Sequence, residues 1–208
     1  MAGTRAAFLE AAAVARQVVA AAVVALRWEE PSALAEMSVG ALAAHVVRAV
    51  TRVERALDDP EPADAVIISA AAYFAPVGPD LASGINVRVR APSAEAALVG
   101  HRALLGQMDR ALNRLHLRLE DQPEGRLVSV RDGEVLRLDD YLATRIIELA
   151  LHTDDLCLSV GLKTPDLPGI EVAIQALVAV AVHRHGDLAV LRALAGRERD
   201  PDQVLRVI

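Results

Sequence analysis

The stretch that follows Ser38 constrains the fold of this chain most strongly. Its apolar residues recur at intervals of three and four and so lie on one face of a helix: Val39, Leu42, Val46, Val50, Val53 and Leu57. Ser38 is a suitable N-cap for that helix. The chain is 53% hydrophobic but only 2% aromatic, so alanine, leucine and valine must supply the packing. This mixture favours helices and argues against a β-sandwich, and we predict a mainly α-helical bundle.

The rest of the chain predicts further helices and one hairpin. The expected helices span about 4–27, 38–57, 63–74, 80–89, 92–119, 139–161, 170–185 and 187–195, with a short helical tail after Pro201. We expect Asp80 to cap the fourth helix, Pro92 to start or kink the fifth, Asp139 to cap the sixth, and Gly161 to end it. Two short strands flank the Asp132-Gly133 pair, which is a strong hairpin signal.

Length and charge exclude several classes of protein. The 208 residues suffice for one compact core, and without an internal repeat or linker we expect residues 1–208 to form a single domain. A net charge of −6 provides no basic surface for nucleic acid. The apolar run from Val18 to Leu26 is too short to span a bilayer, so we expect no membrane partner.

Cys157 is the only cysteine, which rules out an internal disulfide and favours a cytoplasmic location. It follows His152 by five residues and so points to another side of the helix, which favours a buried structural thiol over a nucleophile. Lys163 is the only lysine in a chain rich in arginine, alanine and valine, a usage that indicates a GC-rich, actinobacterial genome.

Glu148 and His152 are the first candidate metal ligands. On a helix, residues four apart lie about 40° apart around the axis and about 6 Å along it, so both side chains can reach one ion. Glu148 lies in a strongly apolar run, where a carboxylate is costly unless it is paired or bound to a metal. If His45 joins them from a neighbouring helix, the set has the ligand count of a catalytic zinc site. In the alternative interpretation, Glu148 pairs with Arg145 and His152 is a core histidine.

Other polar residues are weaker candidates. Asp155, one turn beyond His152, either orients that imidazole or is simply solvated. His101 is an alternative ligand on the long helix that also carries His116. His183 and His185 lie two residues apart at a helix end, where they face opposite ways and where cations are favoured without any site.

Two motifs carry a family resemblance. The first runs from Trp28-Glu-Glu-Pro31-Ser-Ala-Leu34 to Ser38-Val-Gly-Ala-Leu42-Ala-Ala-His45, and the second consists of Arg145, Glu148, His152, Asp155 and Leu156. Together they resemble the mycothiol-dependent maleylpyruvate isomerase family of the DinB-like superfamily. The resemblance implies a four-helix bundle with extra C-terminal helices, and it implies His45, Glu148 and His152 as metal ligands. It also implies a divalent metal as cofactor. We expect Zn²⁺, with nickel, iron and manganese as alternatives.

The same resemblance implies mycothiol as a cosubstrate and a small electrophile as its partner. The isomerase of this family carries a further C-terminal domain that contributes an arginine, and the chain shows no such domain, so we expect an S-transferase more than an isomerase. Arg145 and Asp155 are expected beside the ligands. Arg88, Arg90 and Arg102 are candidates for binding a carboxylate or the sugar hydroxyls of the thiol, or else are surface charges. The alternatives are a non-enzymatic metal-binding scaffold and a ligand sensor, and DinB-like bundles often form homodimers.

Overall fold

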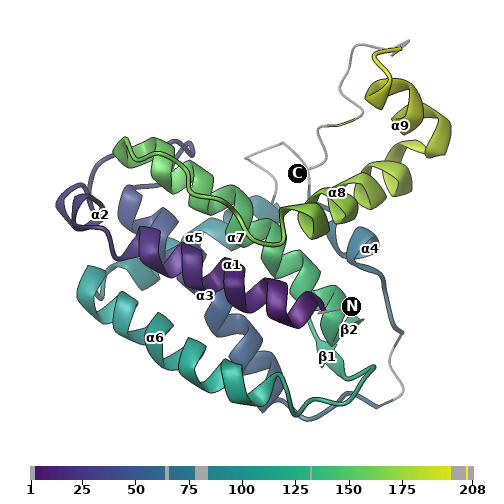
Figure 1. Cartoon of the computed structure of the whole chain (residues 1–208), viewed down its shortest axis with the longest axis horizontal. Coiled ribbons are helices and arrows are strands. Elements are labelled where there is room, and N and C mark those ends of the chain that lie inside the picture. Colours follow the sequence, from purple (N-terminus) through teal and green to yellow (C-terminus); the bar gives the residue numbers. More distant parts are fainter. Residues whose placement is uncertain (1–2, 64–65, 78–83, 132, 198–204, 206–208) are drawn as a thin grey trace.

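The computed structural model describes residues 3–63, 66–77, 84–131, 133–197 and 205. The elements follow in the order α1 (Thr4–Val19), α2 (Ala22–Leu26), α3 (Val39–Asp58), α4 (Ala70–Phe74), α5 (Gly84–Ala97), α6 (His101–Arg118), β1 (Leu127–Ser129), β2 (Val135–Arg137), α7 (Leu138–Val160), α8 (Ile170–His185) and α9 (Asp187–Leu194). The prediction of a mainly α-helical chain with one small hairpin is therefore confirmed (Figure 1).

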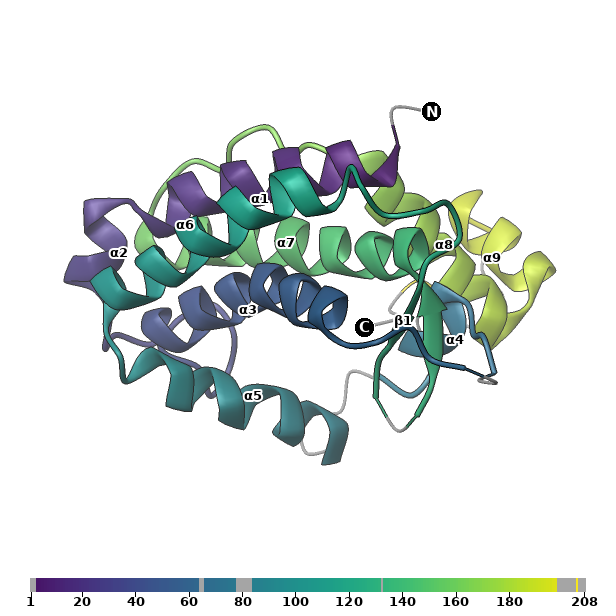
Figure 2. The same cartoon turned by 90° about the horizontal axis from the view of Figure 1, so that it is seen from below.

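Four long helices form the bundle. Helix α1 packs on α7 and α6, and α3 packs on both α6 and α7, so the four enclose one core. Helix α5 lies along the outer side of α3, and α8 packs on α7. Figure 2 shows α4, α8, α9 and the hairpin gathered at one end of the bundle, with α2 at the other. The core and the metal-ligand candidates both depend on the contact between α3 and α7.

Helix α3 forms as the sequence predicts. The Ser38 hydroxyl accepts a hydrogen bond of 3.1 Å from the Ala41 N–H, which satisfies one of the unpaired donors at the helix start. Leu42, Val46 and Val50 on the predicted stripe are fully buried.

Trp28 lies directly against the first turn of α3. A Cβ at Gly40 would come within 2.5 Å of the Trp28 indole, so only glycine allows this approach. The indole Nε1 donates to the carbonyl of Ala97 at 3.3 Å, at the end of α5. The first motif therefore fixes how α3 and α5 meet.

Helix α7 is the central helix and is buried on most of its circumference, with Leu142, Ile146, Ile147 and Leu149 all at most 1% exposed. It ends at Gly161, whose φ of 72° is left-handed, and the Leu162 N–H donates to the carbonyl of Cys157 at 2.9 Å. The predicted glycine stop is confirmed. The predicted cap is wrong, because the helix begins at Leu138 with Arg137 at the N-cap, while the Asp139 carboxylate accepts a hydrogen bond from Arg5 Nε.

The single helix predicted over residues 4–27 is wrong. Helix α1 ends at Val19, and Ala21 is extended, with ψ 134°, before the short helix α2 begins. The carbonyl of Val19 accepts a hydrogen bond from Nε2 of His101 at 2.7 Å. The Val19 carbonyl thus accepts its hydrogen bond from a distant imidazole and not from a backbone N–H in the next turn of a continuous helix.

The helix predicted over residues 63–74 is also wrong for most of its length, because only Ala70–Phe74 is helical in the described part of this segment. Ile67 forms a parallel β-bridge with Val135, and the Ile68 N–H donates to the Val135 carbonyl at 2.8 Å. The β-branched residues here pair with the hairpin, and Ser69 then caps α4 through the Ala72 N–H.

The long helix predicted from Pro92 is displaced. Pro92 lies inside α5, and the break comes later at Gly100, whose φ is 81°. A positive φ is easily reached only by glycine, so the chain turns there into α6. Asp80 and the tail after Pro201, apart from Leu205, lie outside the described residues. None of the described helices has the length and hydropathy needed to cross a bilayer.

Candidate metal centre

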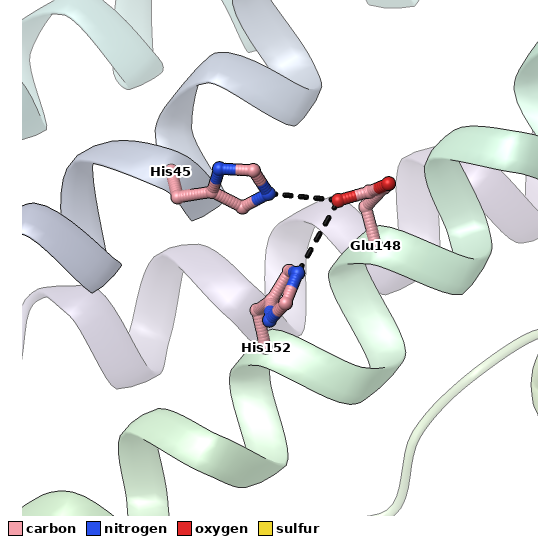
Figure 3. A group of neighbouring side chains, drawn as sticks. All are labelled: His45, Glu148 and His152. Carbon is pink, nitrogen blue, oxygen red and sulfur yellow. Dashed lines mark hydrogen bonds and ion pairs between the residues drawn. The ribbon is translucent and has the colours of Figure 1, made fainter. Parts of the chain in front are cut away.

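The three predicted ligands meet between α3 and α7. His45 extends from α3, and Glu148 and His152 extend from successive turns of α7 (Figure 3). One ligand atom from each lies within 4.8 Å of the other two. Nε2 of His45 lies 2.8 Å from Oε2 of Glu148, and Nε2 of His152 lies 3.3 Å from the same oxygen. The centroids of the two imidazole rings are 4.5 Å apart and the rings are nearly perpendicular, and both Nε2 atoms face the same Glu148 oxygen.

The ionisation of these groups is strongly coupled. Burial opposes the charge on Glu148, but hydrogen bonds with His152 and His45 outweigh it and hold the pKa of that carboxyl well below its usual range. Burial also opposes the charge on His152, but hydrogen bonds with Asp155 and Glu148 raise its pKa to about 9. Burial lowers the pKa of His45 in spite of Glu148. Without a metal, the centre is therefore a carboxylate beside one protonated and one neutral imidazole.

Each imidazole is oriented by a second contact on its other nitrogen. Nδ1 of His152 lies 3.1 Å from Oδ2 of Asp155, and Nδ1 of His45 lies 3.2 Å from Oγ of Ser93. Arg48 donates to the same Ser93 oxygen at 2.6 Å. When Nδ1 carries the proton, Nε2 presents its lone pair toward Glu148, which is the tautomer a metal requires. The donor set and its orientation therefore fit a divalent cation.

Asp155 occupies the place that the sequence analysis suggested, beside the ring of His152. Ser93 was not a candidate, although its side chain is fully buried. It belongs to α5, and nothing in its spacing relative to either motif could have indicated it.

Arg145 does not pair with Glu148 in the described part of the chain. Its guanidinium lies between two aromatic rings, 5.1 Å from the centre of Tyr141 and 5.8 Å from that of Tyr73. It donates from Nε to the Thr144 hydroxyl at 3.1 Å and reaches the Tyr73 hydroxyl at 3.5 Å. The alternative in which Glu148 is satisfied by Arg145 is therefore not what the structure contains.

The remaining histidines lie elsewhere. His101 donates to Val19 and contacts Trp28 edge-on at 5.5 Å, and His116 is exposed on α6. His183 and His185 are exposed in the last turn of α8. Among the described residues, His45, Glu148 and His152 form the one group of three or more His, Cys, Asp or Glu side chains that lie close enough together to hold an ion.

Cys157 is fully buried in the core, and burial raises the pKa of its thiol with a smaller contribution from Asp154. The predicted burial of this thiol is confirmed, and burial with a raised pKa does not favour the thiolate that a nucleophile needs. Of the arginine candidates, Arg102 is exposed on α6, and the side chains of Arg88 and Arg90 lie outside the described part.

A small pocket that is open to solvent borders the ligands. It is lined by His45, Glu148, Ala49 and the arginines Arg48, Arg52 and Arg145. Arg48 and Arg52 did not appear among the candidates. Their spacing could have indicated them, because residues three and seven positions after His45 fall on the same face of its helix.

Comparison with known families assigns most of the chain to one of them. The family described as the mycothiol maleylpyruvate isomerase N-terminal domain matches residues 8–157, which include all three ligand candidates and the arginines of the pocket. Searches of the curated proteins and of the solved structures gave no significant match.

Proposed function

Because the chain belongs to the family of the mycothiol maleylpyruvate isomerase N-terminal domain, we propose that it is a metal-dependent enzyme that joins a small thiol to an electrophile. One observation carries the proposal. Two imidazoles and a carboxylate converge on one point beside an open pocket, and three protein ligands leave room for a further ligand. A structural site would be closed by a fourth protein ligand.

The protein side chains have separable roles. His45, Glu148 and His152 would hold the cation, with zinc favoured by the nitrogen and oxygen donors and nickel, iron and manganese as alternatives. Asp155 and Ser93 fix the two imidazole rings. A bound metal lowers the pKa of a coordinated thiol enough to make the thiolate available at neutral pH.

The family name supports mycothiol as the thiol. Attack of its sulfur on an electrophilic carbon is the first step both of transfer and of thiol-assisted isomerisation. We favour transfer, because it needs no residues beyond a thiol site and space for an electrophile. The pocket beside Glu148 marks the side from which an electrophile would approach the metal.

The experiment follows mycothiol consumption with monobromobimane as the electrophile, using zinc-loaded protein and zinc alone as the background. The account predicts acceleration over the background in the wild type and its loss in Glu148→Gln. Mycothiol should also raise the melting temperature only when zinc is bound, because ligand binding to the native state stabilises it. A fully zinc-loaded wild type that shows neither effect would instead be a non-enzymatic scaffold or sensor.

A further inference from the structure

The pocket beside the metal centre is lined by positive charge. Arg48 and Arg52 extend from successive turns of α3, and Arg145 extends from α7 across from them. Among the lining residues that the structure describes, Glu148 is the one acidic side chain, and two histidines already engage it. A divalent cation at the ligands would increase the positive charge further.

The arginines are close enough to affect one another. Burial and, to a smaller extent, the neighbouring charges of Arg52, Arg145 and Arg55 together lower the pKa of Arg48 to about 10. Arg145 is only 4% exposed, and its described contacts are with a hydroxyl of Thr144 and with two tyrosines, not with a carboxylate. Like charges gathered around a partly desolvated space are unfavourable by themselves, and an anion would relieve that repulsion.

The chemistry of the arginines selects the kind of anion. Guanidinium groups are planar forks whose N–H donors match the two oxygens of a carboxylate. We propose that Arg48, Arg52 and Arg145 form a subsite for a carboxylate carried by one of the two reactants. That the carboxylate belongs to a reactant rests on the proposed function, whereas the binding of a carboxylate depends only on the three arginines.

Arg52 offers the cleanest test. It is exposed at the pocket and makes no hydrogen bond or ion pair with the part of the chain that the structure describes, so its loss should not disturb the fold. Arg55 is a matched control on the same helix, because it is also exposed but does not line the pocket. Replacing either arginine with glutamine changes the net charge equally.

The first measurement is an NMR titration of the protein as purified with benzoate, and with benzamide as the neutral analogue. The metal content of each sample is measured, and variants of equal metal content are compared. Any direct bond between benzoate and the metal then contributes equally to each. We expect saturable benzoate binding that Arg52→Gln weakens about fivefold and that Arg55→Gln leaves nearly unchanged. Equal binding of benzoate and benzamide, or equal weakening by the two variants, would overturn the subsite.

The second measurement identifies which reactant carries the carboxylate. With mycothiol as the thiol, the rates of transfer to iodoacetate and to iodoacetamide are compared. In both reactions the sulfur bonds to the CH₂ carbon, iodide leaves with the C–I electron pair, and the thiol proton passes to solvent. With iodoacetamide as the electrophile, N-acetylcysteine is then compared with its amide. If one of the two comparisons shows a faster rate with the carboxylate compound, and Arg52→Gln reduces this difference, the carboxylate belongs to the reactant varied in that comparison. A preference in neither pair from a protein that transfers thiol would contradict the subsite, whereas no transfer at all with benzoate binding intact would contradict only the proposed function.

Discussion

Nδ1 of His152 lies 3.1 Å from Oδ2 of Asp155, one turn further along α7. The carboxylate accepts the Nδ1–H and so leaves Nε2 facing Glu148, where a metal would take the place of a proton. The second motif thus contains two candidate ligands and the residue that orients one of them.

This relationship predicts that Asp155→Asn weakens metal binding about 10- to 100-fold without loss of helix content. The amide keeps the size of the side chain but removes the charge that favours the Nδ1–H tautomer. Affinity is measured by competition with a chromogenic chelator. Asp154→Asn is the control, because Asp154 is exposed and accepts a hydrogen bond from Thr164. Equal affinities for Asp155→Asn and the wild type would show that Asp155 has no orienting role.

The affinity for metal should rise with pH. The pKa of His152 is raised to about 9 in the metal-free protein, so at neutral pH a metal must displace a proton from it. Titrations between pH 6 and pH 9 should show about one proton released per metal from this group. The release should vanish above about pH 9. A pH-independent affinity over this range would mean that His152 is not a ligand.

The metal-free protein should show the opposite trend in stability. A raised pKa means that protonated His152 stabilises the fold fully below its ordinary value of 6.5, and this stabilisation is lost as the pH rises through about 9. Glu148 acts in the other direction, because its pKa is lowered and its contribution is lost as the pH falls below the ordinary 4.5. Urea unfolding across this range, repeated with His152→Gln, isolates the contribution of the histidine. A difference between the two proteins that did not shrink toward pH 9 would contradict this assignment.

Ligand and core residues on α7 should respond differently to substitution. Glu148→Gln should reduce metal binding while leaving the domain folded, because its side chain faces the pocket. Leu149→Ala should instead cost about 2–5 kcal/mol of unfolding free energy, since Leu149 is 1% exposed. Metal content and denaturant unfolding are measured on both variants. Full metal content in Glu148→Gln would exclude Glu148 as a ligand.

Gly40→Ala should destabilise the contact between α3 and Trp28. The new Cβ would lie 2.5–2.8 Å from three indole atoms, so the ring must move, at a cost of about 1–3 kcal/mol. Gly106→Ala on α6 is the control, because its Cβ meets only the flexible end of Arg110 at 3.4 Å. Trp28 fluorescence and thermal melting report the effect. An unshifted emission and melting temperature in Gly40→Ala would show that the indole does not pack as described.

Much of the fold follows from local patterns in the sequence. The stripe after Ser38, the hairpin of β1 and β2 and the stop at Gly161 each have a cause within a few residues, and each prediction was confirmed, although Asp132 lies outside the described residues. The errors arose where a distant residue decides the local conformation. His101 binds the carbonyl at which α1 ends, and Val135 pairs with the segment that was expected to begin a helix.

The candidate site divides in the same way. The i, i+4 spacing of Glu148 and His152 places them on one face, and His45 lies beside a buried stripe, so these three could be found from the sequence. Ser93 could not, because only the packing of α5 on α3 brings it to His45.

The central claim is tested most directly by the metal content of untagged protein, measured by elemental analysis beside His45→Ala. His116→Ala is the control, because His116 is exposed on α6 and away from the centre. The account predicts about one equivalent of metal in the wild type and in His116→Ala, and little in His45→Ala. A folded wild type that takes up no metal even after zinc is added, or a His45→Ala variant that retains a full equivalent, would contradict it.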